Sequence, residues 1–97
     1  MAKGYWITFY RRVSNPAALA EYGKVAVPVI QAAGGRIIAR GDAVKAFEAG
    51  IKDRSVVIEF DSPAKAIAAY ESPAYQSAKK LLEGAVERDI RIVEGVS

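Results

Sequence analysis

The fold can be inferred most directly from one segment, Ser55-Val-Val-Ile-Glu-Phe-Asp-Ser-Pro-Ala-Lys-Ala-Ile-Ala-Ala-Tyr-Glu-Ser-Pro-Ala-Tyr-Gln76. Its first six residues are β-branched, aromatic and alternating, and they are the strongest strand signal in the chain. Two pairs follow, Ser62-Pro63 and Ser72-Pro73. A serine at such a position accepts a hydrogen bond from the first helical turn, and proline has no N–H to leave unpaired there. The stretch therefore predicts a strand and then two short helices, ending near Glu71 and Glu83.

The same kind of helix start, Asn15-Pro16, lies nearer the amino terminus. Apolar residues then recur every three or four positions, which predicts an amphipathic helix from Pro16 to Ala33. The pair Gly34-Gly35 is expected to end it. Pro28 lies inside this run and removes one backbone hydrogen bond, so we expect a kink around Lys24 to Pro28.

Three further segments have strand character. Residues 4–10 are rich in aromatic and β-branched side chains, and residues 89–94 alternate between polar and apolar. Residues 36–40 are apolar, Gly41-Asp42 interrupts them, and residues 44–49 resume the pattern. We interpret residues 36–49 as one bent strand with a bulge at the interruption, with a separate hairpin as the alternative.

The predicted order is β-α-β-β-α-β, with the second helix divided at Ser72-Pro73. This order consists of two strand-helix-strand halves, which pack as a split βαβ unit. The predicted fold is therefore an α+β, ferredoxin-like antiparallel sheet with helices on one face. At 97 residues the chain suits a single domain, residues 1–97. Apolar residues on both sides of the strands indicate that a second copy covers the other sheet face, so we expect a homodimer.

Composition excludes several classes of site. The sequence has no cysteine and no histidine, so we expect no transition-metal site, and catalysis by a Ser-His or Cys-His pair is impossible. Its 14 basic and 11 acidic residues are dispersed, which argues against a nucleic-acid partner. No apolar run is long enough to span a membrane, and we expect a cytoplasmic protein. No motif indicates a cofactor.

Glu59 is the first candidate for a functional residue, because it lies within the most apolar strand. Alternation places it with Val57, on the face opposite Val56 and Ile58. As a buried carboxylate it could abstract a proton. The structural interpretation is that Glu59 forms an ion pair that fixes sheet register or the dimer contact, with Arg40 or Arg91 as the partner.

Five residues are candidates for ligand binding. Arg40 precedes the Gly41 break, where a bulge could aim its guanidinium at a ligand carboxylate. Ser72 begins a helix whose free N–H groups suit an anion, and Tyr75 could point across that helix start. Trp6 and Tyr22 could line an apolar pocket between the sheet and the first long helix. For each residue, capping, core packing or a surface ion pair is the structural alternative.

Taken together, several segments resemble one family. They are Gly4-Tyr-Trp-Ile7, Gly34-Gly-Arg36, Ala39-Arg-Gly41, Arg54 to Phe60, Tyr70 to Gln76 and Val93 to Val96. The chain is similar to the domain-of-unknown-function family numbered thirteen-thirty (DUF1330). This resemblance implies a dimeric α+β barrel and no established reaction. Relatives by fold include cofactor-independent monooxygenases, muconolactone-isomerase-like proteins and haem enzymes that depend on histidine, which this sequence lacks.

The sequence therefore predicts a homodimer that binds a small organic acid or aromatic molecule. A cofactor-independent reaction, monooxygenase-like or isomerase-like, is the enzymatic version, with Glu59 as base or orienter. The alternative is a non-enzymatic module for ligand binding or assembly. An RNA-recognition module shares this topology, but residues 55–60 lack its basic and aromatic pattern.

Overall fold

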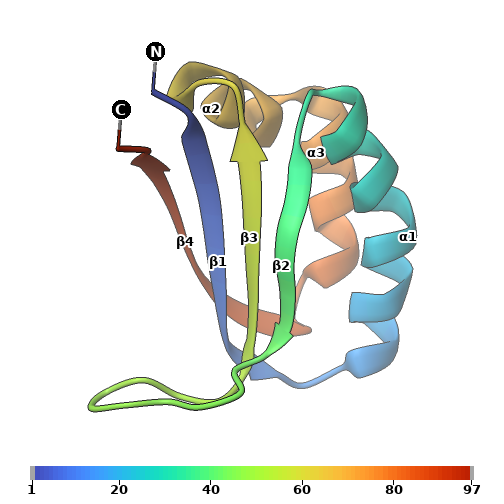
Figure 1. Cartoon of the computed structure of the whole chain (residues 1–97). Helices are drawn as coiled ribbons and strands as arrows, with labels where there is room; N and C mark the ends of the chain where they lie inside the picture. The colour runs from blue at the N-terminus through green and yellow to red at the C-terminus, as the bar shows by residue number, and fades with distance from the viewer. Residues whose placement is uncertain (1, 97) are drawn as a thin grey trace.

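Strand β1 (Gly4–Val13) lies inside a four-stranded antiparallel sheet of order β2-β3-β1-β4. The computed structural model describes residues 2–96. All helices lie on one face of the sheet (Figure 1). The remaining elements are α1 (Pro16–Ala32), β2 (Arg36–Asp42), β3 (Arg54–Phe60), α2 (Pro63–Glu71), α3 (Pro73–Lys79), a short 3-10 turn η1 (Lys80–Leu82) and β4 (Val86–Glu94). The α+β, ferredoxin-like arrangement predicted from the sequence is confirmed.

The polar-proline pairs begin the helices as expected. The Asn15 side chain accepts a hydrogen bond from the Ala18 N–H at 3.1 Å, which caps α1. The Ser62 and Ser72 hydroxyl oxygens cap α2 and α3 in the same way, each at 3.2 Å from the N–H three residues later. Helix α1 stays continuous across Pro28 and ends at Ala32, before Gly34-Gly35.

The two faces of the sheet differ in burial. On the helix-covered face, Trp6, Val56, Ile58 and Phe60 are buried and pack in one core with apolar residues of the helices. On the other face, here called the open face, the alternate residues of the same strands are only partly covered. Phe9, for example, is 41% exposed. The apolar composition of β1 on both sides therefore leaves one apolar face without cover in the single chain.

The predicted strand over residues 44–49 is wrong. Strand β2 ends at Asp42, and residues 43–53 form a long loop that projects beyond the end of the sheet (Figure 1). A strand needs a partner for its backbone groups. The backbone hydrogen bonds within this loop are local ones, from the Ala43 N–H to the Lys52 carbonyl at 3.2 Å and from the Gly50 N–H to the Phe47 carbonyl at 2.9 Å. Val44 and Phe47 on the loop are 95% and 73% exposed.

The predicted bulge exists, but at another place. The register between β2 and β3 shifts between Ile37 and Ala39, rather than at Gly41-Asp42. Ile38 is the extra residue, and it is 55% exposed. A bulge of this kind reverses which residues of the strand face each side of the sheet, and this reversal is important for the site described next.

Candidate functional site

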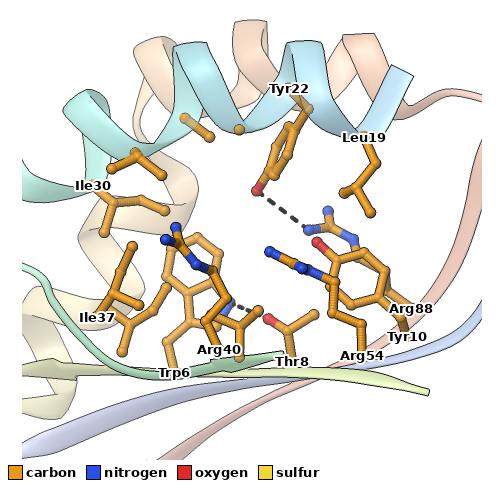
Figure 2. A pocket seen from close by; sticks show the side chains of 15 residues that line it. Trp6, Thr8, Tyr10, Leu19, Tyr22, Ile30, Ile37, Arg40, Arg54 and Arg88 are labelled. Carbon is orange, nitrogen blue, oxygen red and sulfur yellow. Dashed lines mark hydrogen bonds between the residues drawn. The ribbon is translucent and has the colours of Figure 1, made fainter. Parts of the chain in front are cut away.

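A pocket lies on the helix-covered face, between α1 and the sheet (Figure 2). Its cavity volume is about 60 Å³. A water molecule needs roughly 10–15 Å³ of such space, so there is room for a few water-sized groups. The residues that line it are Trp6, Thr8, Tyr10, Leu19, Tyr22, Gly23, Ala26, Val27, Ile30, Ile37, Arg40, Arg54, Val56, Ile58 and Arg88.

Most of the pocket wall is apolar. Helix α1 contributes residues at spacings of three and four, because these positions share one face of a helix. Gly23 is one of them, and a Cβ built on it would meet no atom within 4 Å. The pocket is therefore kept open at Gly23 by the absence of a side chain. Below it, Trp6 and Ile58 on the sheet are 1% and 3% exposed.

Three arginine side chains bring positive charge to this apolar space. They come from three strands: Arg40 from β2, Arg54 from β3 and Arg88 from β4. Figure 2 shows their guanidinium groups pointing from the sheet toward α1. No carboxylate is among the lining residues.

Backbone register explains why these arginines face the pocket. Arg54 lies two residues before the buried Val56, and Arg88 two before Ile90, so each shares the helix-covered face with its neighbour. Arg40 pairs directly with Val56. It reaches this face because of the extra residue at Ile38, without which alternation would turn it to the open face.

Tyrosine hydroxyls hold Arg88 in place. The hydroxyls of Tyr22 and Tyr75 share a hydrogen bond of 2.6 Å. Arg88 donates from one terminal nitrogen to Tyr75 at 3.1 Å and to Tyr22 at 3.4 Å. Its guanidinium also lies 5.8 Å from the ring centre of Tyr10 and 5.5 Å from that of Tyr22, within cation–π range.

The hydroxyls of the two lining tyrosines, Tyr10 and Tyr22, act as hydrogen-bond donors at neutral pH. Burial raises the pKa of Tyr22, and the neighbouring Tyr75 raises it further. Burial also raises the pKa of Tyr10, although Arg88 opposes this effect. Both tyrosines therefore stay protonated. The pocket can bind an anion or stabilise negative charge on a ligand oxygen, but its lining offers no carboxylate or imidazole as a general base.

Four of the predicted site residues come together here. Trp6, Tyr22 and Arg40 line the pocket directly. Tyr75 is fully buried behind Tyr22 and reaches the site through the shared hydrogen bond of the two hydroxyls. Trp6 packs edge-on against Tyr75, with ring centres 4.8 Å apart, and its indole N–H donates to Thr8 at 2.9 Å.

Ser72 lies apart from this pocket, at the junction of α2 and α3. Its hydroxyl oxygen accepts from the Tyr75 N–H, and its hydroxyl donates to the Ala69 carbonyl at 2.8 Å. Both hydrogen bonds are local, and they join the end of α2 to the start of α3.

Glu59 also lies apart from the pocket, on the open face of the sheet. It accepts hydrogen bonds from Arg36 at 3.0 Å and from the Tyr5 hydroxyl at 3.1 Å. The Arg36 hydrogen bond lowers the pKa of Glu59, although partial burial opposes this. The partner is thus Arg36 rather than the predicted Arg40 or Arg91. The pair connects β2 to β3, where Arg36 and Glu59 are register partners.

Comparison with known proteins gives the family. The model of the family described as "Domain of unknown function (DUF1330)" matches residues 3–96. The chain belongs to the DUF1330 family. A search of curated proteins finds no match to this sequence.

Solved structures share the fold of this DUF1330 chain. A protein of unknown function from Rhodopseudomonas palustris is 20% identical, with a TM-score of 0.73 over 99% of this chain and 84% of that one. A dimeric, ferredoxin-like protein of unknown function from Bacteroides fragilis is 16% identical, with a TM-score of 0.58 over 96% and 95%. A protein of Nitrosomonas europaea described as a candidate antibiotic biosynthesis monooxygenase is also 16% identical, with a TM-score of 0.58 over 97% and 90%. At these identities the likeness shows the fold alone.

Two negative findings concern the part of this DUF1330 chain that the structure describes. No helix within residues 2–96 is both long and apolar enough to cross a bilayer. The same residues contain no group of three or more acidic side chains placed to hold a metal ion.

Sequence reasoning missed Arg54 and Arg88 as pocket residues. The signal was present, because each lies two residues from an apolar residue that alternation places on the covered face. An arginine at the end of such a series is easily taken for the solvent-exposed end of a strand. The sequence does not show that α1 crosses above these strand ends and encloses them.

Proposed function

We propose that this protein binds a small organic molecule in the pocket between α1 and the sheet. The observation that carries the proposal is a cavity with apolar walls into which a few polar side chains converge. This combination is typical of small-molecule sites, in which apolar contact gives affinity and a few donors fix orientation. Gly23 supports the proposal. A glycine inside a helix lowers stability by about 0.5–1 kcal/mol relative to alanine, and a binding site that needs the space gives a reason for this loss.

A cofactor-independent reaction in the same pocket is the second candidate. The arginine and tyrosine donors favour it, because donors already in place stabilise negative charge that develops on a substrate oxygen. The fold shared with the candidate monooxygenase of Nitrosomonas europaea is consistent with this function. With no base among the lining residues, the substrate would have to enter as an anion.

We further propose that two copies pack their open sheet faces together. Exposed apolar side chains on this face and on the loop over residues 43–53 support a covering partner. They include Phe9, Val93 and Phe47, which are 41%, 45% and 73% exposed. Similar solved structures are described as dimeric. Such a dimer leaves the pocket accessible, because the pocket lies on the opposite side of the sheet.

The substitution Gly23→Leu tests ligand binding in this pocket. The new side chain would project into space that is now empty, and leucine favours a helix more than glycine does. We expect the variant to fold and to lose binding of small acids and amides such as isovalerate and benzamide. Trp6 is the only tryptophan and lines the pocket, so its fluorescence reports occupancy.

The matched control is Val25→Leu, which introduces the same side chain on the outer surface of α1. Val25 is 45% exposed and does not line the pocket. Binding in this variant should equal that of the wild type. If Gly23→Leu binds the same compounds as tightly as the wild type, ligand binding at this place is refuted.

A further inference from the structure

We infer that the ligand is a small carboxylic acid whose carboxylate binds among Arg40, Arg54 and Arg88 while its apolar part lies along α1. This inference rests on the proposed function and adds the chemical class of the ligand. It depends on how charge is distributed in the molecule, on one unpaired nitrogen atom and on the size of the cavity.

The arginines of the two sheet faces have different partners. On the open face, Arg11 and Arg91 pair with Asp89 at 3.2 Å and 2.9 Å, and Arg36 pairs with Glu59 and Asp61. Within residues 2–96, no ion pair involves any of the three pocket arginines. The ion-paired arginines therefore lie on the open face, and the described residues pair none of the pocket arginines with a carboxylate.

Arg54 has a buried nitrogen atom that lacks a hydrogen-bond partner. Its Nε is the only buried side-chain nitrogen or oxygen atom of the described residues without a hydrogen-bond partner. Leaving a buried donor unpaired is costly, and the cost is greater when the group is charged. A ligand oxygen would supply the missing acceptor.

The neighbouring groups suit the same ligand. Guanidinium groups bind carboxylates through paired N–H donors, and such charge-assisted bonds are among the stronger hydrogen bonds in proteins. Arg88 uses one terminal nitrogen for Tyr22 and Tyr75, which fixes its position and leaves other donors free. Tyr10 and Tyr22, which stay protonated, place no negative charge against a bound anion.

The size and lining of the cavity favour an organic acid over an inorganic anion. A site for free phosphate needs polar groups on most sides, whereas α1 presents Leu19, Ala26, Val27 and Ile30 to this cavity. The volume of about 60 Å³ limits the apolar part to a short or branched chain or a single ring. We therefore choose isovalerate and benzoate as probes.

The experiment compares each acid with the amide of the same shape. Isovalerate and isovaleramide, benzoate and benzamide, and inorganic phosphate are titrated into the wild-type protein by calorimetry. We expect the acids to bind at least about tenfold more tightly than their amides, because one charge-assisted hydrogen bond is worth enough to give that factor. Phosphate should bind more weakly than isovalerate.

Arg54→Met should abolish the preference for acids over amides, and Arg40→Met should reduce it. Arg40 is exposed, so its replacement keeps the test valid if the Arg54 variant does not fold. The control Arg12→Met removes an equal charge from an exposed position outside the pocket and should keep the preference.

The outcomes separate this inference from the proposed function. If amides bind as tightly as acids and Gly23→Leu abolishes both, the pocket is a ligand site and the acid assignment is wrong. If the acid preference survives in both Arg54→Met and Arg40→Met, or phosphate binds more tightly than isovalerate, the assignment is also wrong. If none of the probes binds at millimolar concentration, both proposals fail.

Discussion

At the scale of single residues, Glu59 is a carboxylate in an apolar strand that is held by an ion pair with Arg36. A carboxylate among apolar neighbours suggests a raised pKa and a catalytic base. Here, the carboxylate is 21% exposed and has two donors, Arg36 and Tyr5. Hydrogen bonds to the charged form outweigh partial burial, so the pKa of Glu59 is lowered from its usual value.

A lowered pKa predicts how stability depends on pH. In the folded state Glu59 releases its proton more readily than in the unfolded state, so its contribution to stability is present above the usual value of 4.5. That contribution is lost as the pH falls below 4.5 and through the lower folded pKa. Glu59→Gln should therefore make the free energy of unfolding less sensitive to acid, as measured by urea denaturation at several pH values.

Tyr5→Phe is the companion variant for this measurement. It removes the weaker of the two donors and keeps the Arg36 hydrogen bond, which is the largest cause of the lowered pKa. Its pH dependence should lie between those of the wild type and Glu59→Gln. A Glu59→Gln profile that parallels the wild type would show that the ion pair does not contribute to stability.

At the scale of elements, the close contact between β1 and the start of α2 depends on Gly4. A Cβ built on Gly4 would lie 2.5 Å from both the Cα and the N of Pro63, and 2.6 Å from the carbonyl carbon of Ser62. These are backbone atoms of the helix start, so they cannot move aside as a flexible side chain could. The start of α2 therefore lies directly against β1.

We expect Gly4→Ala to lower the free energy of unfolding by about 1–3 kcal/mol, the usual range for overpacking. Gly23→Ala provides the contrast, because its Cβ meets no atom within 4 Å. It should leave stability unchanged or raise it by about 0.5–1 kcal/mol through helix propensity. Urea denaturation of both variants measures the difference. Equal effects would show that the close approach of α2 to β1 does not constrain Gly4.

Helix starts could be predicted because their signals are local. A cap and a proline act within four residues, and all three such pairs begin helices in the structure. Strands depend on partners that the sequence does not show. Residues 44–49 have strand composition, yet no neighbouring strand reaches them, so they form part of a loop.

The pocket could be predicted only in part for a similar reason. Trp6 and Tyr22 could be predicted to lie near one another, because both suit a pocket between the sheet and the first long helix. Arg40 was a candidate for a different reason, a bulge expected at Gly41-Asp42. Arg54 and Arg88 required knowledge of where α1 crosses the sheet. The orientation of Arg40 depends on one extra residue at Ile38, a register shift that Ile37-Ile38-Ala39 does not signal.

At the scale of the whole molecule, the sheet separates two surfaces with different requirements. The helix-covered face is closed within one chain and contains the pocket with its unpaired arginines. The open face has ion pairs that join Arg36 to Glu59 and Arg91 to Asp89, and it also has exposed apolar residues such as Phe9 and Val93. An apolar surface of this kind on a small protein indicates an interaction site, and a second copy is the partner we propose.

Phe9→Arg tests this dimer. The wild type should sediment at micromolar concentration with twice the 10.4 kDa mass of the chain. In the proposed dimer the second copy covers position 9. An arginine there would bring a charge into the covered surface, which is costly, so the variant should sediment as a monomer. Val25→Arg, on the outer surface of α1 and similarly exposed at 45%, should stay dimeric. A monomeric wild type, or a dimeric Phe9→Arg variant, would contradict pairing through the open face.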